Sequence, residues 1–389
     1  MAGPLGTRRL TTVVAESAGV RSAATDLLQT ASRQTPLLKA HRRLGARLTS
    51  FAGWEMPLQY SGIIAEHSAV RSSAGLFDVS HLGKLKVQGA GATDALQRAV
   101  TADVLALDPG RATYALVLTD AGGCIDDVFV YRIDVDEWLV VPNAANVHSV
   151  AGAIADAGSE PADEWNRWAI LALQGPRSFE IFELAFPESG ATALKLHSWT
   201  SVDVFGEPGM VARTGYTGER GFELYAPAAT AERAFEMLLE LGAAPVGLGA
   251  RDTLRLEMGY ALYGHELSLD INPLEAGLAW AVAWDSPFRG REALEKVRSE
   301  GPRRRLFGVR CSGKGVPRQG QAVYAGERKI GEVTSGNYSP TLGTGIALAL
   351  GPAEAKVDPG GAVEVDVRGR RIPGDIVKPP FVGRARRSQ

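Results

Sequence analysis

The sequence predicts an α+β protein that ends in an all-β, barrel-like domain. Its 389 residues are long for one hydrophobic core, so two or three domains are expected. Strand-like and helix-like segments alternate from Thr35 onward. After Trp284, short β-rich segments are separated by Gly and Pro turns. We therefore expect an N-terminal extension over 1–34, two interleaved α+β domains over 35–286 and a β-barrel-like domain over 287–389.

Charge and composition argue against several classes of protein. The chain carries 42 Lys and Arg against 44 Asp and Glu, and this net charge of -2 provides no field to attract nucleic acid. No stretch approaches eighteen uninterrupted apolar residues, so no membrane span is expected. The two cysteines, Cys124 and Cys311, lie far apart in sequence, which argues against a disulfide framework and favours a reducing compartment.

The extension over residues 1–34 is rich in Ala, Ser and Thr and lacks the apolar run of a secretory signal. Its arginines resemble those of a mitochondrial transit peptide, but Glu16 and Asp26 argue against that interpretation. We expect a loosely ordered extension. The high Ala, Gly and Arg content of the chain favours the cytoplasm of a bacterium, with the mitochondrial matrix as the alternative.

The first structured segments predict a helix-rich start. Residues 35–60 contain a short amphipathic segment followed by a Gly-Trp loop that Pro57 closes. Apolar residues at helical spacing predict a helix over 61–75. Strict alternation predicts one strand over 77–89, and a second helix is expected over 91–107.

Residues 111–158 predict a three-stranded meander followed by a helix. The Gly122-Gly123 turn separates the first two strands, and a turn at 134–137 separates the second from the third. The helix is expected after Asn143.

A second α+β unit follows. An apolar strand that runs into Gly175 and Pro176, and then a helix, are expected over 167–186. Residues 201–227 predict a hairpin-like pair of strands. Further helices are expected over 230–242 and 250–264.

Four stretches combine polar side chains with glycine: FDVSH, GGCIDD, RTGYTGERGFEL and GLGARDTLRLEMGYALYGHEL. The six histidines form no HxxxH spacing, and no CxxC pair is present, so the sequence does not predict a metal site. A GxSxG elbow, a Walker loop and a GxGxxG after a strand are also missing from the sequence.

The stretch GGCIDD places Asp126 and Asp127 beside each other in a predicted strand. Successive residues of a strand point to opposite faces, so at most one of these acids points into a pocket. Burial would raise the pKa of that acid toward a range useful for catalysis. The ordinary alternative is a strand entry, in which one acid accepts backbone N–H groups and the other faces water.

Four further polar residues stand out, and three of them have an ordinary explanation. Glu223 could accept two parallel N–H bonds from a guanidine-like edge such as that of a pterin, or be a surface strand acid. Asn143 fits the routine N-cap of the next helix. Asp252 suits the positive end of the helix that it opens, whereas Arg251 opposes the helix dipole unless an anion or carboxylate meets it.

The motifs together resemble the aminomethyltransferase (T protein) family of the glycine cleavage system. The resemblance rests on motifs that follow in order after residue 34: FDVSHLGKLKV, GGCIDDVFVY, VPNAAN, LALQGP, RTGYTGERGFEL, GLGARDTLRLE, LYGHEL and GEVTSGNYSPTLG. It implies a three-domain, folate-binding fold with a central channel.

The resemblance also implies an activity and its partners. Members of the family take an aminomethyl group from the lipoyl arm of the H protein and transfer its carbon to tetrahydrofolate. The products are ammonia, 5,10-methylenetetrahydrofolate and the reduced lipoyl arm. No metal is implied.

Site residues follow from the same resemblance. The second acid of GGCIDD, Asp127, is the implied catalytic residue and would act close to folate N-10. A nearby carboxylate would stabilise the cationic carbon left when ammonia departs. The implied folate contacts are Tyr114, Asn143, Tyr216, Glu223 and Arg251.

A non-enzymatic alternative exists within the same fold. A folate-binding accessory protein of iron-sulfur cluster assembly carries a KGCYxGQE-type motif, where this sequence has ALYGHEL and no cysteine. The acids of GGCIDD are also retained here, so the enzyme is the preferred interpretation.

Overall fold

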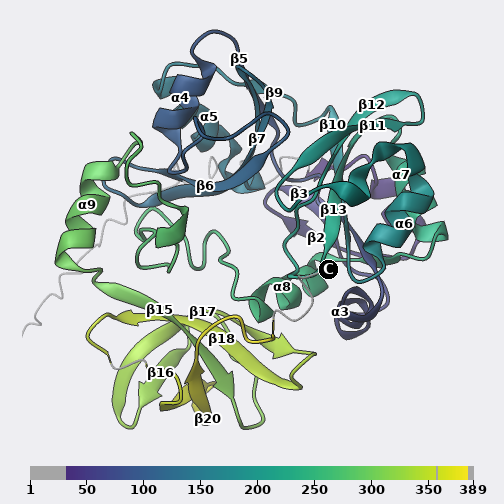
Figure 1. Ribbon diagram of the computed structural model, residues 1–389. Coiled ribbons are helices and arrows are strands. Elements are labelled where there is room, and N and C mark those ends of the chain that lie inside the picture. Colours follow the sequence, from purple (N-terminus) through teal and green to yellow (C-terminus); the bar gives the residue numbers. More distant parts are fainter. Residues whose placement is uncertain (1–31, 356–357, 384–389) are drawn as a thin grey trace, which may run out of the picture.

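The computed structural model describes residues 32–355 and 358–383, in which the chain forms two lobes of sheet and helix and a closed barrel. Figure 1 shows the two lobes, in blue and in teal, above the yellow-green barrel. The predicted α+β class with a C-terminal barrel is confirmed. Most of the predicted extension, residues 1–31, lies outside the described residues. No helix in the described ranges has both the length and the apolar character needed to cross a bilayer.

The first lobe is a five-stranded sheet, in the order β6-β7-β8-β5-β9, with two helices. Its elements are β5 (Leu85–Gln88), α4 (Ala92–Ala99), β6 (Ala112–Leu118), β7 (Cys124–Asp134), β8 (Glu137–Val141), the 3-10 helix η1 (Ala144–Asn146), α5 (Val147–Asp156) and β9 (Ala162–Asp163). The meander and helix predicted over 111–158 are confirmed. Helix α4 is shorter than predicted because Val100 is extended and bridges to Val117 of β6.

Alternation along β7 decides which side chains leave the core of the first lobe. Val128 and Val130 belong to that core. Asp127 and Phe129, one residue out of step, are partly exposed on the other face. The sheet therefore turns one acid of the GGCIDD stretch inward and the other outward.

The second lobe is a six-stranded sheet, in the order β11-β12-β13-β10-β4-β14. Its elements are β4 (Gly75–Asp78), β10 (Trp168–Gln174), α6 (Ser178–Ala185), the 3-10 helices η2 (Pro187–Ser189) and η3 (Ala191–Ala193), β11 (Trp199–Val204), β12 (Glu207–Ala212), β13 (Gly221–Pro227), α7 (Ala231–Glu240) and β14 (Ala244–Val246). Helix α7 buries Ala231, Ala234, Phe235 and Leu238, the one-sided spacing of a helix packed on a sheet.

Two sequence predictions for these sheets are wrong. The single strand predicted over 77–89 is two strands in different sheets, β4 and β5, because the chain turns after Asp78, whose side chain accepts the backbone N–H of Ser80. The segment predicted as a hairpin over 201–227 contains three strands, β11, β12 and β13. The third, β13, pairs with β12 on one side and with β10 on the other.

A small three-stranded sheet and a helix precede the lobes. It contains β1 (Arg33–Gln34), β2 (Arg47–Phe51) and β3 (Trp54–Gln59), and α2 (Leu38–Arg43) lies between β1 and β2 in sequence. The loop predicted before Pro57 is instead a hairpin, which turns at Ala52 and Gly53, both with positive φ. Helix α3 (Ile63–Ser72) follows, as predicted.

Helix α8 (Leu248–Glu257) lies between the second lobe and the barrel in Figure 1. It ends before residue 264, the predicted end, because Gly259 takes a positive φ of 67° and the N–H groups of Gly259 and Tyr260 bond back to the last turn. The 3-10 helix η4 (Ala279–Ala281) and helix α9 (Arg291–Glu300) lead to the barrel. The closed barrel runs β15-β18-β17-β16-β19-β20, with β15 (Arg304–Cys311), β16 (Ala322–Ala325), β17 (Arg328–Ser339), β18 (Thr344–Pro352), β19 (Ala362–Val367) and β20 (Arg370–Val377).

Gly123, at the entry to β7, has almost no room for a side chain. A Cβ there would lie 1.7 Å from the backbone oxygen of Leu269. We expect Gly123→Ala to lower the free energy of unfolding by about 1–3 kcal/mol, because the backbone at residue 123 or at Leu269 must move to make room for the methyl group. Urea unfolding would measure the loss. Gly152→Ala in α5 is the control, since an added methyl group meets nothing within 4 Å there, and equal stability of the two variants would contradict the prediction.

Candidate active site

A cavity of about 690 Å³ lies among the two lobes, α8 and the barrel. Its wall is formed by strands of both lobes, the loop before β13, α8 with the loop that follows it, and barrel strand β17. All six residues that the sequence nominated line it: Tyr114, Asp127, Asn143, Tyr216, Glu223 and Arg251.

The two adjacent acids of β7 have different surroundings. Asp127 reaches the cavity, whereas the side chain of Asp126 is sealed inside the first lobe with 0 % exposure. The sequence left open which of the two points into a pocket, and the register of β7 places Asp127 there.

Asn143 connects these acids through its side-chain amide. Its Nδ2 donates to Oδ1 of Asp126 and to Oδ1 of Asp127, both at 2.9 Å. Its backbone N–H donates to Oδ2 of Asp126 at 2.8 Å. The predicted N-cap role is wrong, because the side chain makes no capping bond to the helix and is used on the carboxylates instead.

Asn146 and Tyr114 complete the polar contacts of the pair. Nδ2 of Asn146 donates to Oδ1 of Asp126 at 2.8 Å. The Tyr114 hydroxyl donates to Oδ2 of Asp127 at 3.1 Å. The Tyr114 ring stacks on Trp280, which is 69 % exposed, so the pair lies close to the protein surface.

Burial raises the pKa of both carboxyl groups above the ordinary range of an aspartate. The charge of Asp127 raises that of Asp126 further, and the bonds from Asn143 and Asn146 oppose the rise. Burial, together with the charge of Asp127, also raises the pKa of Tyr114 well above its ordinary value. The tyrosine therefore stays protonated.

Glu223 lies on β13 and is largely buried. Thr214 donates to its Oε2. Burial raises the pKa of Glu223, while Thr214 and the charge of Arg251 counteract this. One oxygen of the carboxylate is thus anchored by protein, and the group borders the cavity.

Arg251 lies in the first turn of α8, with its guanidinium 4.8 Å from the centre of the Tyr216 ring. Within residues 32–355 and 358–383, its guanidinium makes no hydrogen bond or ion pair, and only its backbone N–H donates, to Gly247. Burial lowers its pKa, and the charge of Glu223 opposes that change. The neighbouring Asp252 does not open the helix as predicted, because α8 begins at Leu248. Its carboxylate accepts from Arg255 and from Asn337 of the barrel, both at 2.8 Å.

His81 is a cavity residue that the sequence did not nominate, although it lies in the FDVSH stretch. It is 3 % exposed, and its Nδ1 has no hydrogen-bond partner among the described residues. Burial and the nearby charge of Arg251 lower the pKa of His81 to about 3, so the imidazole is neutral. Ser335 and Asn337 of β17 were also missed, since no local pattern marks them as facing another domain.

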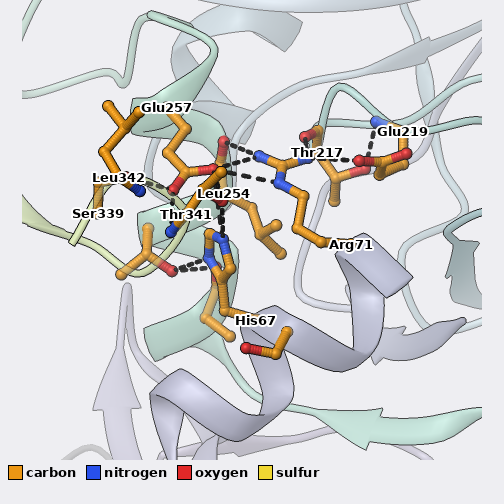
Figure 2. A network of polar contacts seen from close by, with 12 residues as sticks. His67, Arg71, Thr217, Glu219, Leu254, Glu257, Ser339, Thr341 and Leu342 are labelled. Atoms are coloured by element: carbon orange, nitrogen blue, oxygen red, sulfur yellow. Dashed lines mark hydrogen bonds and ion pairs between the residues drawn. The ribbon is translucent and has the colours of Figure 1, made fainter. Parts of the chain in front are cut away.

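A network of polar contacts surrounds Glu257 at the end of α8 (Figure 2). Glu257, at the end of α8, accepts from Nε and NH2 of Arg71 at 3.1 and 2.8 Å. It also accepts from the hydroxyls of Ser339 and Thr341 in the barrel, at 2.5 and 2.9 Å. His67 lies 3.3 Å from the same carboxylate. The network therefore ties α3, α8 and the barrel together.

No group of three or more His, Cys, Asp or Glu side chains is placed to hold a metal ion within residues 32–355 and 358–383.

Comparison with known proteins finds relatives that match most of the chain. Residues 37–286 match the family described as the GCVT N-terminal domain, and residues 304–383 match the glycine cleavage T-protein C-terminal barrel domain. An aminomethyltransferase of Mycobacterium leprae is 46% identical over 356 residues, which is 89% of this chain and 96% of that protein. One from Rubrobacter xylanophilus is 47% identical over 360 residues, 91% of this chain and 95% of that protein. The crystal structure of glycine cleavage system aminomethyltransferase T from Bartonella henselae matches with a TM-score of 0.83 and 31% sequence identity, over 90% of this chain and 98% of that one.

Proposed function

The chain belongs to the glycine cleavage T-protein family, and on that premise we propose that it is a tetrahydrofolate-dependent aminomethyltransferase. The substrate is the aminomethyl group carried on the dihydrolipoyl arm of the H protein. Its carbon passes to tetrahydrofolate, which gives 5,10-methylenetetrahydrofolate, ammonia and the dihydrolipoyl H protein. The single observation that carries this proposal is the convergence of six side chains, nominated from separate motifs, on one cavity.

The cavity has the size and the polar groups that tetrahydrofolate needs. Its volume of about 690 Å³ falls within the range of roughly 300–1,000 Å³ that small-molecule sites occupy. Glu223 is suited to accept the adjacent N–H donors of a pterin edge. The Arg251 guanidinium, which lies over the Tyr216 ring and interacts electrostatically with Glu223, supplies N–H donors for an oxygen of the pterin. Tyr216 borders the cavity beside them.

Asp127 is the residue that we propose for the chemistry. Departure of ammonia leaves a cationic carbon on sulfur, and a carboxylate facing that carbon stabilises it. The same carboxylate can orient the folate nitrogen that attacks. Tyr114 and Asn143 hold one oxygen each, which fixes the orientation of the group before substrate arrives.

The partners and location are part of the proposal. The lipoylated H protein would bring the aminomethyl group to the Asp127 side of the cavity. The bacterial source of the relatives from Mycobacterium leprae and Rubrobacter xylanophilus supports the expected bacterial cytoplasm.

The direct test is tetrahydrofolate-dependent ammonia release from H protein loaded with the aminomethyl group. We expect ammonia and methylenetetrahydrofolate in equal amounts, and no release when tetrahydrofolate is omitted. A protein that binds tetrahydrofolate but releases no ammonia would overturn the proposal and favour the accessory folate-binding protein.

Glu223→Gln is expected to weaken tetrahydrofolate binding by roughly 10- to 100-fold, because a charge-assisted pair of hydrogen bonds is replaced by one acceptor and one donor. Isothermal titration calorimetry would measure the dissociation constant. Glu207→Gln is the matched control, since Glu207 is an exposed strand acid of the same sheet. Equal affinities of the two variants would remove Glu223 from the folate site.

A further inference from the structure

The hydrogen bonds around Asp126 favour its ionised form. Three N–H groups point at its two oxygens: the backbone N–H of Asn143, Nδ2 of Asn143 and Nδ2 of Asn146, all within 2.9 Å. Amide N–H groups can only donate. Each of these three bonds would weaken if Asp126 carried a proton, because the acceptor oxygen would lose charge.

The contacts of Asp127 suit either protonation state. It has two side-chain donors, Nδ2 of Asn143 and the hydroxyl of Tyr114. A hydroxyl can donate or accept a hydrogen bond, so the Tyr114 hydroxyl can also accept one from a protonated Asp127. Asp127 is partly exposed and faces the cavity, whereas Asp126 has no route to a substrate.

Two adjacent buried carboxyl groups do not both ionise readily, and their titration is shared. The two hydrogens of the Asn143 amide bridge Asp126 and Asp127 directly. Depth of burial alone would favour the protonated form of Asp126. Protonation of Asp126 would, however, weaken its three hydrogen bonds from Asn143 and Asn146, because an amide N–H group cannot act as an acceptor instead.

We infer that Asp126 holds the fixed negative charge of the pair and that Asp127 begins each turnover protonated, as the acid that donates to the departing amine. Asp126 is therefore a positioning residue, which acts through Asn143 and through its charge. The inference rests on the proposed transferase function and deepens it.

The protons balance through one cycle. As the carbon–nitrogen bond breaks, its electron pair leaves with nitrogen, which takes the Asp127 proton and departs as neutral ammonia. The carbon stays bonded to sulfur as a cation, and Asp127, now a carboxylate, faces it. The first folate nitrogen to attack forms its bond to carbon and returns its proton to Asp127. The second folate nitrogen then bonds to the carbon as the carbon–sulfur bond breaks, and sulfur keeps the electron pair of the broken bond and takes the proton of that nitrogen.

The test is the pH dependence of single-turnover ammonia release. The reaction needs protonated Asp127, so its rate should fall as pH rises through the pKa of that group. This fall is the alkaline limb of the pH–rate profile. The titratable groups that interact electrostatically with the pair come from several elements: Tyr114 on β6, Cys124 on β7, Tyr216 before β13 and Tyr263 after α8. None of these four carries charge at neutral pH. The ionisable residues Glu223, Arg251 and Arg255 line the same cavity and stay the same in the Asp126 variants, so a shift in the pH at which the rate falls reports the charge of Asp126.

Asp126→Asn removes the fixed charge and should move the alkaline limb to lower pH by about one unit or more, because Asp127 loses a negative neighbour. Asp126→Glu keeps the charge and should leave the limb in place even if the rate drops. Asp134→Asn is the matched control, an exposed acid at the far end of the same strand. An unmoved limb in Asp126→Asn, or equal loss of rate at every pH, would overturn the inference.

If Asp126→Asn does not fold, Asn146→Ala provides the test of the shared proton. It withdraws one donor from Asp126 and shifts the shared proton toward that residue, so the rate should fall at every pH without a move of the limb to lower pH. A rate equal to that of the wild type would overturn the inference. Absence of ammonia release from the wild type is a separate result, which would contradict the transferase function itself.

Discussion

Asp127→Asn is expected to lower the rate of tetrahydrofolate-dependent ammonia release by roughly 10²- to 10⁴-fold, the usual contribution of a positioned acid or base. Asparagine keeps the size of the side chain and one oxygen for the Tyr114 hydroxyl. It can neither donate a carboxyl proton nor face the cationic carbon with a negative charge. The loss should therefore appear in kcat.

The same variant should still bind tetrahydrofolate with nearly the affinity of the wild type, because the proposed binding groups, Glu223 and Arg251, are intact. Rapid-mix measurement of ammonia and calorimetric titration of tetrahydrofolate separate the two effects. Asp134→Asn again serves as the control. A variant that keeps more than about a tenth of the wild-type rate would exclude Asp127 as the acid.

Local sequence patterns predicted much of this architecture. Alternation in β7 and one-sided spacing in α7 follow directly from which residues must be buried, so these elements could be predicted. The two errors at β4–β5 and β11–β13 have a common cause. Both concern which sheet a strand joins, and that depends on pairing with residues far away in sequence.

The orientation of the two acids could not be predicted for a different reason. The acids are followed by four apolar or aromatic residues, Val128, Phe129, Val130 and Tyr131. Both faces of β7 therefore carry apolar side chains, and the sequence pattern does not say which face is the core. The N-cap explanation for Asn143 failed similarly. A local rule accounted for the residue type, but the actual partners lie 16 and 17 residues away on the neighbouring strand.

Contacts between domains gave no local signal at all. Ser335 and Asn337 reach the cavity only because the barrel packs against α8. Arg71 and Glu257 are 186 residues apart, and either alone resembles an ordinary charge on a helix. A family resemblance could nominate motif residues, whereas such pairs require the folded chain.

The second large effect is expected at Glu257, on the stability of the protein. Glu257→Gln keeps the shape of the side chain but removes one of the two carboxylates that pair with Arg71, so that only Glu219 remains. Removing one partner of a buried ion pair typically costs about 3–5 kcal/mol, and the remaining pair with Glu219 places the expected loss at the lower end of that range. Ser339 and Thr341 also lose a charged acceptor, so the contact between α8 and the barrel should loosen. Urea unfolding at neutral pH would show the loss.

The pH dependence of that loss provides a sharper test. Burial alone would raise the pKa of Glu257, but hydrogen bonds and charge from His67, Ser339 and Arg71 outweigh it and lower the pKa to about 2. The stability that Glu257 contributes is therefore complete above about pH 4.5, its ordinary pKa, and is lost as pH falls from there toward 2. The difference between wild type and Glu257→Gln should be constant from pH 7 to pH 5 and shrink below pH 4.5.

Glu240→Gln is the matched control, because Glu240 is an exposed glutamate that ends α7 as Glu257 ends α8. It should change stability by less than about 0.5 kcal/mol at any of these pH values. A Glu257→Gln variant as stable as this control would mean that the network in Figure 2 adds no net stability. A large loss that does not shrink in acid would instead assign the effect to side-chain packing, because only the ionised carboxylate is titrated away.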